Sequence, residues 1–139
     1  MNDTAAFPPR IELRCGPVTA VDLALFAAAS GDHNPLHLDS EVARAAGFDR
    51  PVVHGMLTCA YAARLFTQQF GAGCVRRLRT RFSGVALLGD TLHLSAELTK
   101  VESGVAHYTL NVRTTAAAAG AEQRDVATGQ AQVARTIGA

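Results

Sequence analysis

The sequence predicts an α+β domain in which a curved antiparallel sheet wraps around one long helix. The segment from Gly55 to Phe70 contains no proline and carries large apolar side chains at helical spacing, which predicts the long helix. After it, apolar and polar residues alternate in four consecutive stretches, as is typical of strands. With 139 residues, of which 48% are apolar, the chain is long enough to form one domain with a single core.

The first elements of the chain are short. Residues 1–9 contain two prolines and no periodic pattern, and we expect them to form a flexible lead-in to a single domain over residues 10–139. Apolar and charged residues alternate over residues 11–15, which predicts a half-buried strand. Thr19 is suited to cap a helix over residues 21–29, which presents one apolar face.

A second short helix is predicted before the long one. Asp39 or Ser40 is suited to cap it, and Gly47 would end it after residues 41–46. The strands that follow the long helix are expected at residues 75–82, 91–101, 105–115 and 125–136. Glycine-containing pairs at residues 89–90 and 103–104 predict tight turns, and the alanine-rich tract at 116–121 is expected to be the tip of a long hairpin.

Composition excludes several classes of partner. The net charge of +1 favours neither nucleic acid nor an acidic partner. The three cysteines, Cys15, Cys59 and Cys74, are an odd number without CxxC spacing, which indicates free thiols in a reducing compartment. The longest apolar stretch is interrupted by polar and charged residues, and the first ten residues lack the pattern of a signal peptide. We therefore expect a cytoplasmic protein that does not bind a membrane.

The most informative segment is the octet Ser-Gly-Asp-His-Asn-Pro-Leu-His at residues 30–37. Asp32 and His37 stand five residues apart, and Asn34 and Pro35 between them favour a turn. A turn there can bring the carboxylate and the imidazole to face one point. Such a pair is suited to moving a proton near neutral pH.

Each of these residues also has a simpler interpretation. Asp32 alone can serve as a turn residue, and His37 alone can be a buried histidine that bonds the backbone. His33, His37 and His54 have no cysteine or carboxylate at the spacing of a zinc site, so we expect no metal and no other cofactor.

Taken together with His54-Gly55-Met56-Leu57 downstream, the octet resembles the MaoC-like family of (R)-specific enoyl-CoA hydratases and 3-hydroxyacyl thioester dehydratases. The resemblance covers nearly the whole chain. It implies the hot-dog fold, in which a curved antiparallel sheet surrounds a central helix over about residues 55–70. It also implies reversible hydration of trans-2-enoyl thioesters of coenzyme A or a carrier protein to (R)-3-hydroxyacyl thioesters.

The resemblance also implies roles for individual residues. Asp32 and His37 match the catalytic aspartate and histidine, and Gly55 matches the glycine whose backbone N–H polarises the thioester carbonyl. We expect Asn34 to brace the loop, and Asn34, His54 and Thr58 to contribute to the substrate site. Some members carry a serine in the first turns of the central helix, and this chain offers only Thr58 as a substitute hydroxyl there.

Arg77, Arg79 and Arg81 would share one face of their predicted strand. They form either a solvated surface or a landing site for the phosphates of coenzyme A or of a carrier protein's phosphopantetheine.

Three functions remain open at this point. The leading hypothesis is the hydratase or dehydratase, acting as a lyase. A hot-dog thioesterase is an alternative, although residues 57–70 contain no aspartate or glutamate to activate water. A non-catalytic partner subunit is the third. We also expect a homodimer or larger homo-oligomer, because a single sheet would leave an edge strand and an apolar flank exposed.

Overall fold

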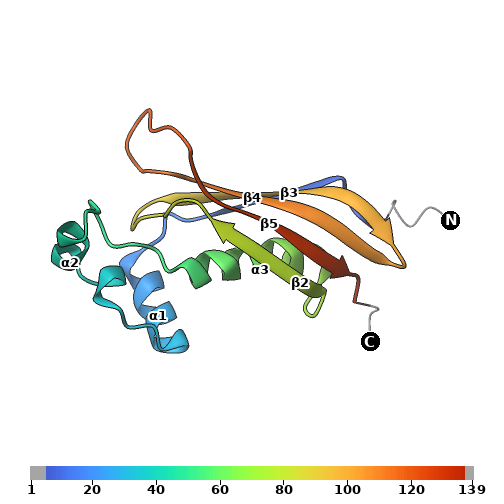
Figure 1. Ribbon diagram of the computed structural model, residues 1–139, viewed down its shortest axis with the longest axis horizontal. Helices are drawn as coiled ribbons and strands as arrows, with labels where there is room; N and C mark the ends of the chain where they lie inside the picture. The colour runs from blue at the N-terminus through green and yellow to red at the C-terminus, as the bar shows by residue number, and fades with distance from the viewer. Residues whose placement is uncertain (1–5, 137–139) are drawn as a thin grey trace.

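The computed structural model describes residues 6–136, which form five strands and four helical segments. All five strands belong to one antiparallel sheet, and the longest helix lies against one face of it (Figure 1). The elements in chain order are β1 (Arg10–Cys15), α1 (Ala20–Ser30), η2 (Pro35–His37), α2 (Ser40–Ala45), α3 (Gly55–Phe70), β2 (Val75–Phe82), β3 (Thr91–Glu102), β4 (Val105–Thr115) and β5 (Arg124–Ala134).

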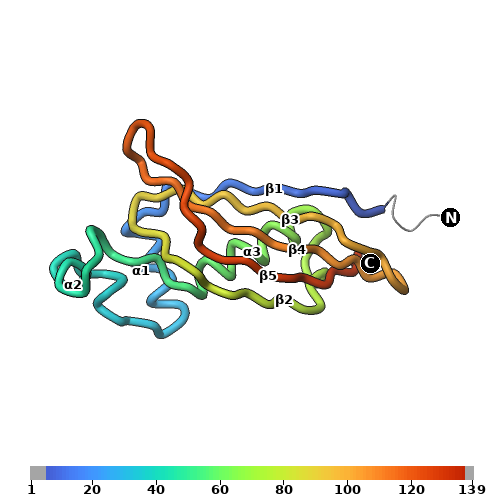
Figure 2. Tube along the Cα trace, turned by 45° about the horizontal axis from the view of Figure 1, so that its top comes forward, coloured from blue at the N-terminus to red at the C-terminus, as the bar shows by residue number. Residues whose placement is uncertain are grey.

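The sheet has the strand order β1-β3-β4-β5-β2, so β1 and β2 form its two edges (Figure 2). Strands β3, β4 and β5 are joined as consecutive hairpins. The β3–β4 turn contains only Ser103 and Gly104, both with positive φ, which is the geometry of a two-residue hairpin turn. The β4–β5 connection is the long hairpin tip that the alanine-rich tract predicts.

The core lies between α3 and the sheet. Leu57, Leu65 and Phe66 on α3 are buried, and the Phe66 ring lies 5.6 Å from that of Tyr108 on β4. Alternate residues of β3 and β4 are buried on the same side, as the period of a half-buried strand requires. None of the helices in residues 6–136 combines the length and apolar character needed to cross a bilayer.

The structure differs from the flexible lead-in expected over residues 1–9. Phe7 is buried and its ring lies 5.5 Å from that of Phe70 at the end of α3. The Pro8 carbonyl accepts a hydrogen bond from the Tyr108 hydroxyl, and the Pro9 carbonyl accepts one from the Leu98 amide. Residues 6–9 are therefore anchored to the core through an aromatic side chain that the local pattern did not reveal, and residues 1–5 lie outside the described part.

Candidate active site

Helix α1 delivers the octet to one end of the sheet, beside the beginning of α3 (Figure 1). Thr19 caps α1: its side chain accepts a hydrogen bond from the Asp22 amide, and the Asp22 carboxylate accepts one from the Thr19 amide. Gly31 ends α1 in the left-handed conformation with φ of 78°, which a glycine adopts without steric cost. The chain therefore leaves the helix abruptly, and Asp32 is the first residue beyond the turn.

Local hydrogen bonds fix the loop that carries Asp32. The Asp32 Oδ1 atom accepts from the Asn34 amide at 3.3 Å, and the Asn34 Oδ1 atom accepts from the Leu36 amide at 3.0 Å. The Asp32 amide donates to Ser30 Oγ at 3.1 Å. These short-range bonds are the ones that aspartate and asparagine form in turns. Asn34 thus braces the loop, and Asp32 Oδ2 remains available for other contacts.

The His37 ring has a defined orientation. Its Nδ1 atom lies 2.7 Å from the Val52 carbonyl oxygen, and its Nε2 atom lies 3.5 Å from Asp32 Oδ2. A carbonyl oxygen can only accept, so Nδ1 carries the hydrogen. In the neutral ring, Nε2 then presents a lone pair to the Asp32 carboxylate. The side chain of His37 is 11% exposed and that of Asp32 is 50% exposed, so the pair is open to solvent from the side of the carboxylate.

The arrangement of Nε2 and Oδ2 is suited to one water molecule. Both atoms are acceptors, and at 3.5 Å they are too far apart for a direct bond. A water molecule placed against both can donate one O–H to each of them. The geometry therefore supports activation of water, with His37 Nε2 as the base.

His54 supports this pair from the side of the core. It is 1% exposed, and its ring stacks on that of His37 with centroids 3.8 Å apart. The Phe26 ring packs edge-on against the His54 ring, with centroids 4.8 Å apart. His54 Nε2 lies 3.2 Å from the Asp32 carbonyl oxygen and therefore donates to it, which leaves Nδ1 buried and without a partner among the described residues. Burial lowers the pKa of His54, so the ring is held neutral.

We predict that His54 makes stability depend on pH. Because its pKa is lowered from 6.5 in the folded protein, the unfolded chain binds a proton at higher pH. The contribution of the neutral His54 ring to the free energy of unfolding is therefore complete above about pH 6.5. It is lost as the pH falls from there toward the pKa that His54 has in the folded protein. Urea unfolding of the wild type and of His54→Gln should show a stability difference that shrinks between about pH 7.5 and about pH 5.5. A difference that stays constant over this range would contradict the neutral buried ring.

The beginning of α3 lies next to these residues in the chain. Gly55 is its first residue, so its backbone N–H has no partner within the helix. A side chain at this position would approach the Phe82 ring, because a Cβ atom would lie 3.4 Å from Phe82 Cζ. Thr58 is buried in the first turn of α3, while Met56 is 67% exposed. The exposed N–H at a helix N-terminus is suited to stabilising negative charge on an oxygen atom.

Asp32, His37 and His54 each offer one ligand atom, and these atoms all lie within 4.8 Å of one another. His54 Nε2, however, donates to the backbone carbonyl of Asp32. It would have to give up this bond to coordinate an ion. The donor set therefore fits the hydrogen-bonded arrangement better than a metal centre.

The structure does not bring Arg77, Arg79 and Arg81 into this cluster. Thr80, between two of them, faces α3 and lies 3.1 Å from Cys59 Sγ, so the arginines point to the opposite face of the sheet. There Arg79 and Arg81 help line a surface hollow of about 1080 Å³, whose lining includes neither Asp32 nor His37. Two contacts of the site had no signal in the sequence. The Val52 carbonyl that accepts from His37 belongs to the backbone, and Phe26, which packs on His54, has the pattern of an ordinary core residue of its helix.

Comparison with known proteins agrees with the fold. A family model described as the MaoC like domain matches residues 9–121. The (R)-specific enoyl-CoA hydratase of Aeromonas caviae is 36% identical over 96 residues, which cover 68% of this chain and 72% of that protein. The solved structure of the A. caviae (R)-hydratase superposes with a TM-score of 0.78 at 31% identity and covers 91% of this chain and 94% of that one.

Other curated relatives are longer. The 3-hydroxyacyl-thioester dehydratase Y of Mycobacterium tuberculosis is 35% identical over 125 residues, which are 86% of this chain and 41% of that protein. Peroxisomal multifunctional enzyme type 2 of Mus musculus is 39% identical over 88 residues, 61% of this chain but only 12% of that protein. The chain therefore corresponds to one part of these larger proteins. Its fold is the hot dog, and the chain belongs to the MaoC-like domain family.

Proposed function

We propose that this protein is a hydro-lyase that reversibly hydrates trans-2-enoyl thioesters to (R)-3-hydroxyacyl thioesters. The observation that carries the proposal is the pairing of His37 Nε2 and Asp32 Oδ2 at 3.5 Å, with the tautomer of His37 set by the Val52 carbonyl. The names of the A. caviae and M. tuberculosis relatives support the substrate class.

In the proposed reaction, one water molecule is held between Asp32 and His37. His37 Nε2 takes a proton from this water as its oxygen forms a bond to C3 of the enoyl group. The electrons of the C2–C3 double bond move toward the thioester, whose oxygen gains negative charge. The Gly55 N–H donates a hydrogen bond to that oxygen. The proton that was taken from the water then passes to C2, so one water has been added and no other reactant is consumed.

The thioesterase alternative receives less support from the site. Hydrolysis requires a nucleophile or a carboxylate that directs water at the thioester carbon, and α3 offers no aspartate or glutamate for the second of these roles. The purified protein alone should therefore remove the enoyl-thioester absorbance of crotonyl-CoA without releasing a free thiol. Release of thiol at the rate at which the absorbance is lost would support the thioesterase. No reaction without a second subunit would support the partner-subunit hypothesis.

We further propose that Arg77 and Arg79 bind substrate phosphates. Replacing both with alanine should raise KM for a coenzyme A substrate and leave kcat nearly unchanged, because a contact of this kind is made equally in the ground and transition states. A short pantetheine thioester without the nucleotide should be unaffected. The proposal rests on the charge pattern of β2, because the structure places these arginines on the sheet face opposite to α3 and outside the cluster of Asp32 and His37. Equal effects on both substrates, or none, would leave them as a solvated strand face.

We also propose that the protein is at least a homodimer. β2 is an edge strand of the sheet, and the apolar side chains of Met56 and Phe82 beside Gly55 are 67% and 44% exposed. Pairing of two copies would cover both features. Light scattering should give at least twice the mass of one chain at micromolar concentration. A single-chain mass that does not change with concentration would refute the proposal.

A further inference from the structure

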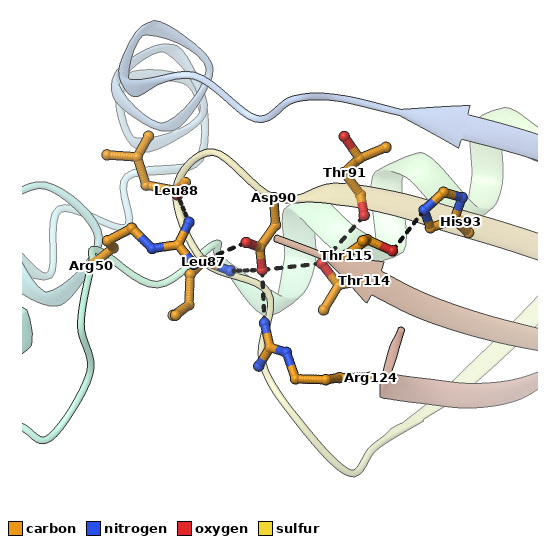
Figure 3. Close-up of polar contacts among 9 residues, drawn as sticks. All are labelled: Arg50, Leu87, Leu88, Asp90, Thr91, His93, Thr114, Thr115 and Arg124. Carbon is orange, nitrogen blue, oxygen red and sulfur yellow. Dashed lines mark hydrogen bonds and ion pairs between the residues drawn. The ribbon is translucent and has the colours of Figure 1, made fainter. Parts of the chain in front are cut away.

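The connection between β2 and β3 contains a fully buried carboxylate. Asp90 is 0% exposed, and its Oδ2 atom accepts from the Leu87 amide at 3.0 Å, from Thr114 Oγ1 at 3.1 Å and from Arg124 at 2.9 Å (Figure 3). Its Oδ1 atom forms an ion pair with Arg50 at 3.1 Å, and no described residue donates a hydrogen bond to it. The two arginines hold the two oxygens of one carboxylate, and a buried charge of this kind is costly unless it is paired.

The two arginines come from different parts of the chain. Arg124 begins β5, whereas Arg50 lies in the loop that leads into α3. Arg50 uses two nitrogens at once: one pairs with Asp90, and the other donates to the Leu88 carbonyl (Figure 3). This forked contact, one hydrogen bond and one ion pair, restrains the position and the direction of the guanidinium group.

The loop that Arg50 anchors is paired with the segment around Leu87. The Leu88 amide donates to the Pro51 carbonyl at 2.8 Å, and the Val53 amide donates to the Ala86 carbonyl at 2.9 Å. An isolated antiparallel bridge joins Val52 to Leu87 between these bonds. Residues 50–53 are therefore held in register against residues 86–88, with the Arg50 fork at one end.

The same loop orients the proposed base. The Val52 carbonyl accepts the Nδ1–H of His37 at 2.7 Å, and the Val52 amide donates to the Leu36 carbonyl at 3.1 Å. A shift of Val52 would therefore change which nitrogen of His37 carries the hydrogen.

We propose that Arg50, held by the buried Asp90 carboxylate, is a positioning residue that sets the tautomer of His37 through the Val52 carbonyl. The expected kinetic effect rests on the proposed function. The expected effect on the His37 tautomer does not, because the tautomer is a property of the free protein.

Arg124 supplies a matched control. It pairs with the same carboxylate at a similar distance and is also partly exposed, but it makes no hydrogen bond or ion pair with residues 50–53. Arg50→Gln and Arg124→Gln therefore each remove one partner of Asp90, and we expect similar losses of thermal stability. Only Arg50→Gln should lower kcat, by about tenfold with KM within about twofold, the lower end of what loss of a histidine-orienting partner costs in metal sites. Arg50→Lys keeps the charge but not the forked contact, so its kcat should lie between those of the wild type and Arg50→Gln. It replaces Arg50→Gln in the test if that variant does not fold.

The deciding readout is the nitrogen NMR spectrum of the histidine rings at alkaline pH, with His37 assigned by its loss in His37→Ala. In the wild type and in Arg124→Gln, Nδ1 of His37 should have the shift of a hydrogen-bearing nitrogen. In the Arg50 variants the two tautomers should be mixed. An unchanged His37 signal in the Arg50 variants, or equal kinetic losses in Arg50→Gln and Arg124→Gln, would overturn the proposal. If the wild type proves inactive on enoyl thioesters while the Arg50 variants still mix the tautomers, the proposed function fails and the positioning role stands.

Discussion

Asp32→Asn and His37→Ala are each expected to lower turnover on an enoyl thioester by at least about 10²-fold, the lower end of what a positioned acid or base contributes. His37→Ala removes the Nε2 lone pair. Asp32→Asn replaces one of the two acceptors that face the proposed water with a side chain that can present an N–H donor instead. Either change breaks the two-acceptor site. Initial rates at saturating substrate, for the wild type and both variants, measure the loss.

Both variants should remain folded. The Asp32 side chain is half exposed, and an asparagine can still accept from the Asn34 amide. His37→Ala loses the stacking on His54, which remains held by its bond to the Asp32 carbonyl and by Phe26. Circular dichroism spectra and melting curves provide the control. Near-normal turnover in either folded variant would mean that the pair is a turn residue and a backbone-bonded histidine.

Gly55→Pro is expected to lower turnover by about 10²-fold relative to Gly55→Ala, because proline removes the N–H proposed to stabilise the thioester oxygen. Proline is favoured at the first position of a helix, where no helical partner is lost. The preceding residue, His54, has φ of −52° and ψ of 132°, and this ψ suits the position before a proline. The variant therefore deletes one donor with little change to the backbone.

Gly55→Ala is the matched control, since alanine keeps the N–H and adds only the Cβ atom that would contact Phe82 at 3.4 Å. A loss in the alanine variant measures crowding against the substrate, and the further loss in the proline variant measures the donor. Melting curves of both variants check that α3 still begins at residue 55. Equal activities of the two folded variants would show that the N–H of Gly55 takes no part in the reaction.

The parts of the fold that depend on local patterns could be predicted. The long helix was expected at residues 55–70 and is found there, because its apolar spacing is uninterrupted and glycines follow it. The hot-dog fold implied by the octet and His54-Gly55 is confirmed by the single five-stranded sheet and by its match to the A. caviae hydratase. The turn between Asp32 and His37 follows from Asn34, whose side chain makes the expected local bond.

Contacts between distant segments could not be predicted in this way. Phe7 packs on Phe70, sixty-three positions later in the chain, and nothing near it in the sequence marks it as a core residue. The bond from His37 to Val52 involves a backbone carbonyl, which leaves no trace in the identity of the residue. The partners of Asp90, Arg50 and Arg124, converge only once the sheet has formed.

The arginine strand shows the limit of a periodic pattern. Alternation places Arg77, Arg79 and Arg81 on one face, and this is what the structure has. The pattern cannot tell which face of the sheet α3 covers. That choice is made by burial of Leu78 and Thr80 toward the helix, and it decides how far the arginines lie from the dyad.

The most direct test of the central claim is a mass measurement on the product. Purified protein, without any partner, is incubated with crotonyl-CoA in water enriched in the heavy oxygen isotope, and the product is resolved on a chiral column. The proposed reaction should give an intact (R)-3-hydroxybutyryl-CoA that carries one heavy oxygen at C3, and its rate of formation should fall in Asp32→Asn and His37→Ala. Labelled free acid together with coenzyme A, or unchanged crotonyl-CoA, would contradict it.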